Sequence, residues 1–406
     1  MFVYADNAAT TAVSPKVVEA MLPYFTEVYG NPSSLYSVGQ KAKEELEEAR
    51  ERIAKVLGAA PREIYFTSGG SEADNQAIIS AARIGEKKGK KHIISTKFEH
   101  HAVLHTLQAL EKEGFEIELL DVHSNGVVTA QQVADAIRED TALVTIMYAN
   151  NEIGTVQPIP EIGAICKERG VLFHTDAVQA VSHLHINVKE QNIDMLSISA
   201  HKFHGPKGVG VLYARGGIVL TNVINGGAQE RGKRAGTENL AGIVGMAVAL
   251  EEAVAHMDEN NEKFAKLQDR LIEGLSKIPY SELNGDRNQR VKSNVNFCFE
   301  GIEGESLLLL LDDKGVAVSS GSACTSGSLD PSHVLLAIGR PHEVAHGSLR
   351  VSLGEDATEE QVDYIIKSVT EVVEYLRGFS PFWGDLVSGK RPHVLHQEGA
   401  PLGKIS

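Results

Sequence analysis

A lysine lies between two apolar runs in residues 199–208 (SAHKFHGPKG). Residues 195–198 precede this segment and residues 209–213 follow it, which predicts a buried strand, a Gly/Pro turn and a second buried strand. A lysine at the end of a buried strand loses hydration, which lowers its pKa and favours Schiff-base formation with an aldehyde or ketone. Lys202 is therefore a candidate for covalent chemistry. On this segment alone, an ordinary lysine at a strand exit is the alternative.

Two further segments place polar groups where strands are predicted to end. Residues 67–75 (TSGGSEADN) follow an apolar run and open a helical pattern, so Gly70 and Ser71 lie where backbone N–H groups bind an anion. An ordinary capped strand–turn–helix explains this segment equally well. Asp176 ends the apolar run of residues 172–175. A buried carboxylate there needs a partner, such as a protonated pyridine nitrogen, unless it is simply an N-cap.

Asparagine and histidine follow two more predicted strands. Asn151 belongs to residues 150–154 (NNEIG), where asparagines most often cap a turn but also orient polar ligands. His100 follows the predicted strand of residues 92–95. A histidine at this sheet edge is suited to stacking on a flat ring, although most such histidines are ordinary polar residues.

Cys324 lies in residues 319–328 (SSGSACTSGS), a run of small and hydroxyl side chains. This composition predicts a flexible, exposed loop, which suits a thiol that moves between two sites and reacts as the thiolate. A silent cysteine in a serine-rich loop is the alternative. Cys166, on a predicted helix, and Cys298, on a predicted strand, are interpreted as packing residues.

The composition is that of an ordinary globular enzyme, with 406 residues, 42% hydrophobic and 23% charged. The net charge of -15 argues against nucleic-acid binding. Three cysteines, no basic and apolar leader at the N-terminus and no apolar run of membrane-spanning length predict a cytoplasmic protein without a membrane anchor. The Cys/His spacing predicts no metal site.

The order of the elements predicts an α/β fold with a large, doubly wound, mostly parallel sheet. In such sheets ligands bind at the carboxyl ends of the strands, where the polar residues above are found. Helices are expected at residues 41–57, 130–138 and 159–169. Strands are expected at residues 64–67, 92–95, 143–148, 172–175, 195–199 and 209–213.

A smaller α/β domain is expected to follow a long helical connection in residues 242–275. Its apolar segments, interpreted as β-rich, are residues 295–299, 307–311, 316–319 and 349–353, and a helix is expected at residues 359–376. We assign residues 12–260 to a large domain. Residues 1–11 and 261–378 form the small domain, which carries a mobile cysteine loop at residues 319–330. The Pro- and Gly-containing tail, residues 379–406, is expected to be irregular.

Together these segments resemble the cysteine desulfurases, fold-type I pyridoxal phosphate enzymes of the class V aminotransferase group. The resemblance runs from residues 6–11 (DNAATT) to about residue 376 and includes residues 176–179 (DAVQ) and 234–239 (RAGTEN). The cysteine segment is similar to the long-loop class, which passes sulfur to iron–sulfur scaffold proteins. Residues 31–34 (NPSS), 236–239 (GTEN) and 345–347 (AHG) resemble the nitrogen-fixation subtype more than the housekeeping one.

The resemblance implies roles around a pyridoxal 5'-phosphate cofactor. Lys202 would hold the cofactor aldehyde and later shuttle protons. Asp176 would pair with the pyridinium nitrogen, Gln179 would contact the ring hydroxyl, and His100 would stack on the ring as a third member of the catalytic set with Lys202 and Cys324.

The resemblance also implies a phosphate site that two subunits share. The residues that would hold the phosphate are Gly70, Ser71, Ser199 and His201, and Thr237 would reach in from the second subunit of a homodimer.

For the substrate, L-cysteine, the resemblance implies that Asn151 and Arg350 bind the carboxylate. Cys324 would attack the substrate sulfur, leaving L-alanine and an enzyme persulfide, and would meet an iron–sulfur cluster only when sulfur is transferred to the scaffold protein. A selenocysteine lyase or an aminotransferase on the same fold is the alternative.

Overall fold

The computed structural model describes residues 1–320 and 331–395. Its largest feature is a seven-stranded sheet with the strand order β2-β8-β7-β6-β5-β3-β4. The four pairings among β7, β6, β5, β3 and β4 are parallel, and β8 pairs antiparallel with both β2 and β7. The strands are β2 (Ile64–Thr67), β3 (His92–Thr96), β4 (Glu116–Leu120), β5 (Thr141–Thr145), β6 (Leu172–Asp176), β7 (Met195–Ser199) and β8 (Gly210–Ala214). The mostly parallel α/β fold is confirmed.

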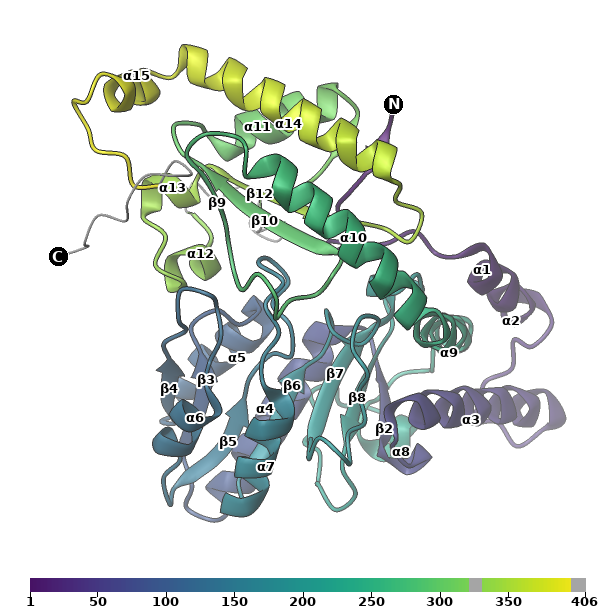
Figure 1. Ribbon diagram of the computed structural model, residues 1–406. Helices are drawn as coiled ribbons and strands as arrows, with labels where there is room; N and C mark the ends of the chain where they lie inside the picture. The colour runs from purple at the N-terminus through teal and green to yellow at the C-terminus, as the bar shows by residue number, and fades with distance from the viewer. Residues whose placement is uncertain (321–330, 396–406) are drawn as a thin grey trace.

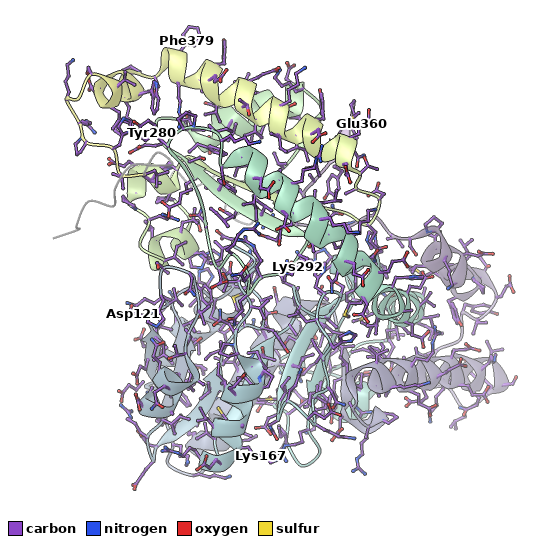
Figure 2. All side chains as sticks on the ribbon, in the orientation of Figure 1. Asp121, Lys167, Tyr280, Lys292, Glu360 and Phe379 are labelled. Carbon is purple, nitrogen blue, oxygen red and sulfur yellow. The ribbon has the colours of Figure 1, made fainter. Side chains whose placement is uncertain are left out.

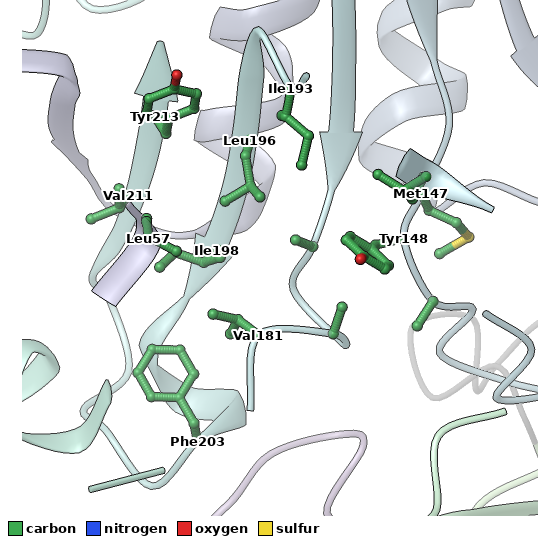
Figure 3. Close-up of a cluster of buried hydrophobic side chains, with 14 of the residues drawn as sticks. Leu57, Met147, Tyr148, Val181, Ile193, Leu196, Ile198, Phe203, Val211 and Tyr213 are labelled. Atoms are coloured by element: carbon green, nitrogen blue, oxygen red, sulfur yellow. The ribbon is translucent and has the colours of Figure 1, made fainter. Parts of the chain in front are cut away.

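Neighbouring residues on each strand enter different cores, because successive side chains of a strand point to opposite faces. Leu196 of β7 packs in one core and Met195 in another. Helices α4 (Gly70–Glu86) and α5 (His101–Lys112) cover the Met195 face. Helices α3 (Ser37–Leu57), α7 (Ile159–Arg169) and α9 (Leu240–Ala255) cover the Leu196 face. Figure 3 shows this second core, with Leu57 of α3 near Ile198 and Val211.

Short sequence signals set the ends of the covering helices. Ser14 caps α1 (Pro15–Met21) by accepting a hydrogen bond from the Val17 amide. Thr129 begins α6 (Ala130–Ala136) with a capping box that Gln132 completes. Gly58 ends α3 at φ 71°, a left-handed conformation that favours glycine. The short elements beside them are α2 (Pro23–Thr26), the 3₁₀ turns Pro61–Glu63 and Ala200–Lys202, and α8 (Gln229–Gly232).

A second layered unit lies above the large sheet in the view of Figure 1. Its antiparallel sheet has the order β12-β10-β9, and the chain's first strand, β1, pairs in parallel with β11. Helices α10, α11 and α14 pack with these strands around a core that includes Val3, Phe297 and Val369. Glu360 and Phe379 mark the two ends of α14 (Figure 2). The elements are β1 (Val3–Tyr4), α10 (Met257–Leu275), β9 (Ser281–Leu283), β10 (Asn294–Phe299), α11 (Gly304–Asp313), β11 (Val316–Ala317), α12 (His333–Ala337), α13 (His342–Ala345), β12 (Ser348–Ser352) and α14 (Glu359–Phe379).

Two sequence-based expectations about elements are wrong. Residues 307–311, read as β-rich, lie in α11, because Leu307 and Leu311 are four apart and bury one face of a helix. The helical connection expected at residues 242–275 is helical, and it consists of α9 and α10 with a bend of 63° between them. The tail, expected to be irregular from residue 379, contains α15 (Pro381–Val387), which Ser380 caps. Pro381 is in the first turn of α15, where a proline favours a helix start.

No single helix in the described ranges is long and apolar enough to span a membrane. Taken together, α9 and α10 have the length and the apolar composition of a membrane span, but the chain bends between them. Most of α9 is buried, and the helix packs against α1 and α3.

Candidate active site

One cavity of about 450 Å³ opens at the carboxyl ends of β6 and β7. This is the edge at which open α/β sheets bind ligands. The cavity brings together ten of the residues singled out from the sequence, which come from both layered units. They are Gly70, Ser71, His100, Asn151, Asp176, Gln179, Ser199, His201, Lys202 and Arg350.

Lys202 ends the 3₁₀ turn that follows β7. Its Nζ donates hydrogen bonds to the carbonyl oxygens of Ala8 at 2.6 Å and Ala9 at 2.8 Å. Phe203, the next residue, is buried, and its side chain packs in the core that Figure 3 shows. The amine is therefore held at a defined place in the cavity, as covalent chemistry requires.

Asp176 ends β6 beside the lysine, with only 5% of its surface exposed. Its Oδ1 accepts a hydrogen bond from the Val178 amide at 2.9 Å. Burial raises the pKa of Asp176 to about 6, while that hydrogen bond and the nearby Lys202 act to lower it. The carboxyl group is thus ionised at neutral pH, and a cation placed against it would be strongly bound.

A second buried acid, Asp74 of α4, lies close to Asp176. Ligand atoms of Asp74, His100 and Asp176 all lie within 4.8 Å of one another. Burial, and then the charge of Asp176, raise the pKa of Asp74 well above its usual range. His174 packs behind this pair, bonded to Thr145 at 2.8 Å, and burial lowers its pKa to about 3, so it adds no positive charge. Asp74 and Asp176 therefore form a buried acidic site that favours a bound cation.

The N-terminus of α4 forms the anion-binding side of the cavity. Gly69 and Gly70 pack closely against neighbouring segments: a Cβ added at Gly70 would lie 2.7 Å from Val178, and one at Gly210 of β8 would lie 2.7 Å from the Cα of Gly69. Ser71 is in the first turn of α4, and Ser199 ends β7 opposite it. Backbone N–H groups at a helix start, with small residues around them, suit a phosphate.

His201 adds a neutral imidazole to this side of the cavity. Its Nδ1 lies 3.1 Å from Thr10 Oγ1, and its backbone carbonyl accepts a hydrogen bond from the Thr11 amide. Burial, and then the nearby Lys202, lower the pKa of His201 to about 4.

His100 caps α5, and its Nδ1 accepts a hydrogen bond from the Ala102 amide at 3.1 Å. Burial, and then the charge of Lys202, lower the pKa of His100 to about 4. At neutral pH it is an uncharged ring that lines the same cavity as Asp176. A neutral imidazole of this kind is suited to stacking on an aromatic ligand.

Arg350, on β12, enters the cavity from the upper layered unit with its side chain 2% exposed. Its Nη2 donates to Asp6 Oδ1 at 2.7 Å, and its Nη1 donates to the Asn151 carbonyl oxygen at 3.0 Å. The guanidinium is well placed to bind a carboxylate with two parallel hydrogen bonds.

Sequence reasoning gave no role to residues 6–11, although these residues contact four of the ten site residues in the cavity. Gln179 donates to the Ala8 carbonyl oxygen, which also accepts from Lys202. Thr10 contacts His201, and Asp6 contacts Arg350. Only the resemblance of residues 6–11 to the family pointed to this segment, because the residue types and their spacing match no pattern of a binding or catalytic site.

Two predicted site residues are not among those that line the cavity. Thr237 is exposed and is absent from the cavity wall of this chain. Cys324 lies outside the described residues. The other two cysteines are buried and unpaired, and burial raises the pKa of Cys166 to about 12 and that of Cys298 to about 11, so neither is a ready thiolate.

A buried aspartate and a lysine at neighbouring strand ends, facing an anion-binding helix start, define an aminotransferase-type site. The family model for aminotransferase class V matches residues 3–365. A cysteine desulfurase IscS of Clostridium botulinum (strain Hall) is 56% identical over 391 residues, which are 96% of this chain and 98% of that protein. The IscS of Methanosarcina thermophila is 57% identical over 379 residues, 93% and 94% of the two chains.

Solved structures agree with this assignment. A NifS-like protein superposes with a TM-score of 0.87 at 40% identity, covering 93% of this chain and 100% of that one. The structure described as SspA in complex with cysteine has a TM-score of 0.76 at 39% identity, covering 86% and 98%. The chain therefore belongs to the cysteine desulfurases of the class-V aminotransferase family.

Proposed function

We propose that this enzyme binds pyridoxal 5'-phosphate at Lys202 and converts L-cysteine to L-alanine, with its sulfur passing to Cys324. The observation that carries the proposal is the meeting of Lys202, Asp176 and Arg350 in one cavity. These side chains supply an amine for an aldehyde, an anion for a protonated ring nitrogen and a cation for a substrate carboxylate.

The residues present fit the cofactor. Two buried carboxyl groups, Asp74 and Asp176, lie together, and Asp74 Oδ1 has no hydrogen-bond partner among the described residues. This environment favours a bound cation such as a pyridinium. The helix start at Gly70 suits the phosphate. When bound, pyridoxal phosphate supplies an electron sink for charge that develops at the substrate α carbon.

The protein's own groups then have separate tasks. Asp176 would keep a proton on the ring nitrogen of the bound cofactor, and the neutral His100 would stack on its ring. Lys202 would take the proton from the substrate α carbon. Arg350 and Asn151 orient the substrate through its carboxylate, which holds the sulfur toward the incoming thiol.

Sulfur transfer balances with a single thiol. The Cys324 thiolate attacks the substrate sulfur; an S–S bond forms, the substrate C–S bond breaks, and its electron pair takes a proton at the β carbon. Return of the proton from Lys202 to the α carbon completes L-alanine. The products are alanine and a persulfide on Cys324. The residues on either side of the segment that contains Cys324 support this role, because both contact residues that line the cavity. The backbone of Ser319 pairs with that of Arg350, and the Ser332 hydroxyl donates to Glu152.

We also propose that the enzyme is a homodimer in which Thr237 reaches the partner's phosphate. Thr237 is exposed here, and exposed apolar side chains gather in residues 22–36, where Leu22, Phe25, Tyr29 and Leu35 are 59–93% exposed. Exposed apolar side chains in this number are typical of a surface that a partner subunit covers.

The sulfur acceptor that we propose is an iron–sulfur scaffold protein, with a persulfide on Cys324 as the donor. We retain the nitrogen-fixation subtype as a proposal, supported by residues 31–34, 236–239 and 345–347. The unpaired Cys166 and Cys298 support a reducing compartment, and we propose the cytoplasm.

The test is a product assay on the purified enzyme with L-cysteine and a thiol reductant. Alanine and sulfide in equal amounts support the desulfurase. Pyruvate, or transfer of the amino group to a keto acid, would instead indicate a lyase or an aminotransferase. Activity confined to L-selenocysteine would indicate a selenocysteine lyase.

A further inference from the structure

Asp6 holds the arginine that enters the cavity. Its Oδ1 accepts the Nη2–H of Arg350 at 2.7 Å, while the Asn151 carbonyl oxygen accepts from Nη1 at 3.0 Å. Two fixed acceptors therefore bind two different nitrogens of one planar guanidinium. Because the guanidinium is rigid and planar, two such contacts define the plane in which it presents its remaining N–H groups.

The position of Asp6 is itself fixed independently of Arg350. Asp6 forms a parallel bridge with Ser352, two residues beyond the arginine on β12. The Asn7 amide donates to the Ser352 carbonyl oxygen at 3.2 Å, and the Ala8 amide donates to the Ser352 hydroxyl at 2.9 Å. The contact between carboxylate and guanidinium is thus set by the backbone, not by two flexible side chains that meet by chance.

The burial of the pair makes the contact strong. The side chains of Arg350 and Asp6 are only 2% and 17% exposed, so solvent screens the attraction weakly. A buried guanidinium that loses a charged partner is free to adopt another orientation or to bind another acceptor. Its alignment with a ligand would then be lost.

We propose that Asp6 is a positioning residue that orients Arg350 and thereby sets the preference of the site for amines that carry a carboxylate. The inference rests on the proposed function, in which Arg350 binds the substrate carboxylate. Asp6 itself does not touch the substrate; it acts through the arginine.

The variants are D6A, which removes the acceptor, and D6N, which keeps an oxygen acceptor but not the charge. The matched control is Tyr4→Phe. The Tyr4 hydroxyl donates to the carbonyl oxygens of Asp6 at 3.2 Å and Thr10 at 2.8 Å, so its loss loosens the same segment and leaves the Asp6 side chain in place.

The measurement is the visible absorbance of the cofactor-loaded enzyme, titrated with L-alanine and, separately, with ethylamine, which lacks the carboxylate. We expect D6A to weaken L-alanine binding at least tenfold and ethylamine binding less than twofold. D6N should give an intermediate loss for L-alanine alone, and Tyr4→Phe should change neither. With L-cysteine, D6A should raise KM at least tenfold and change kcat less than threefold.

Several results would overturn the inference. These are an unchanged affinity of D6A for L-alanine, an equal loss for both amines, or an equal loss in Tyr4→Phe, which would show that the segment is merely structural. If D6A fails to fold, D6N gives the same comparison. Wild-type enzyme that binds L-alanine better than ethylamine but releases no sulfide would contradict the proposed function and leave the role of Asp6 standing.

Discussion

Replacement of Asp176 by asparagine should affect the cofactor-free and the cofactor-loaded enzyme in opposite directions. In the cofactor-free protein the folded pKa of about 6 lies above the ordinary value of 3.8, because burial disfavours the charged form. The folded state therefore holds more protons than the unfolded state between these values. Ionisation of Asp176 therefore lowers the free energy of unfolding of the cofactor-free protein. This penalty is absent well below pH 3.8, grows as the pH rises and is complete well above pH 6.

The size of this penalty follows from the two pKa values. It is about 3 kcal/mol at pH 7 and about half of that at pH 5. Asp176→Asn removes the charge, and its amide oxygen still accepts the Val178 N–H that Asp176 accepts at 2.9 Å. We therefore expect the cofactor-free variant to be more stable than the wild type, with an advantage that is larger at pH 7 than at pH 5 by about 1 kcal/mol.

The loaded enzyme should show the reverse effect. The variant lacks the anion that would hold a protonated ring nitrogen, and a loss of about 3 kcal/mol weakens cofactor binding about 100-fold.

Urea unfolding of the cofactor-free proteins at both pH values and an absorbance titration with pyridoxal phosphate measure the two effects. Asp121→Asn is the control, because its side chain is 80% exposed and should change neither result. A cofactor-free variant that is less stable than the wild type at pH 7 would refute the reasoning.

Two further predictions test other parts of the structure. Iodoacetamide at pH 7.5 should modify one thiol of the folded chain and leave Cys166 and Cys298 intact, because both thiols are buried and have raised pKa values. Peptide mass spectrometry measures this, and modification of Cys166 or Cys298 would contradict the prediction. Arg50→Met should lower the free energy of unfolding by about 3–5 kcal/mol, since it leaves the buried Glu230 carboxylate without the guanidinium that binds it at 2.8 Å. The exposed Arg270→Met serves as the control and should unfold at the wild-type urea concentration; equal effects of the two changes would contradict this account.

The sequence predicted the large sheet well, because its strands are short apolar runs separated by clear helical patterns. Lys202 and Asp176 could be placed at strand ends from those runs alone, and the parallel order of the sheet brings such ends together. The error at residues 307–311 also comes from reading a short apolar run as a strand. Five consecutive leucines fit a buried strand and a helix equally well, and only the packing of α11 against the small sheet and α14 decides between them.

The contribution of residues 6–11 could not be predicted from spacing. Asp6 and Arg350 are 344 residues apart in the chain, and their contact exists because Asp6 pairs with Ser352 in the folded protein. The raised pKa of Asp74 likewise depends on burial and then on a neighbour, Asp176, and only the tertiary structure supplies both. Contacts of this kind decide the electrostatics of the site, and local sequence patterns do not record them.

The most direct test of the central claim is a single-turnover reaction of the loaded enzyme with L-cysteine, without a reductant, in the wild type and in Cys324→Ala. We predict one alanine per active site in the wild type and a mass increase of one sulfur atom on the peptide that contains Cys324. The variant should keep the cofactor absorbance and form neither alanine nor a persulfide. Alanine formation by Cys324→Ala at the wild-type rate would contradict the account.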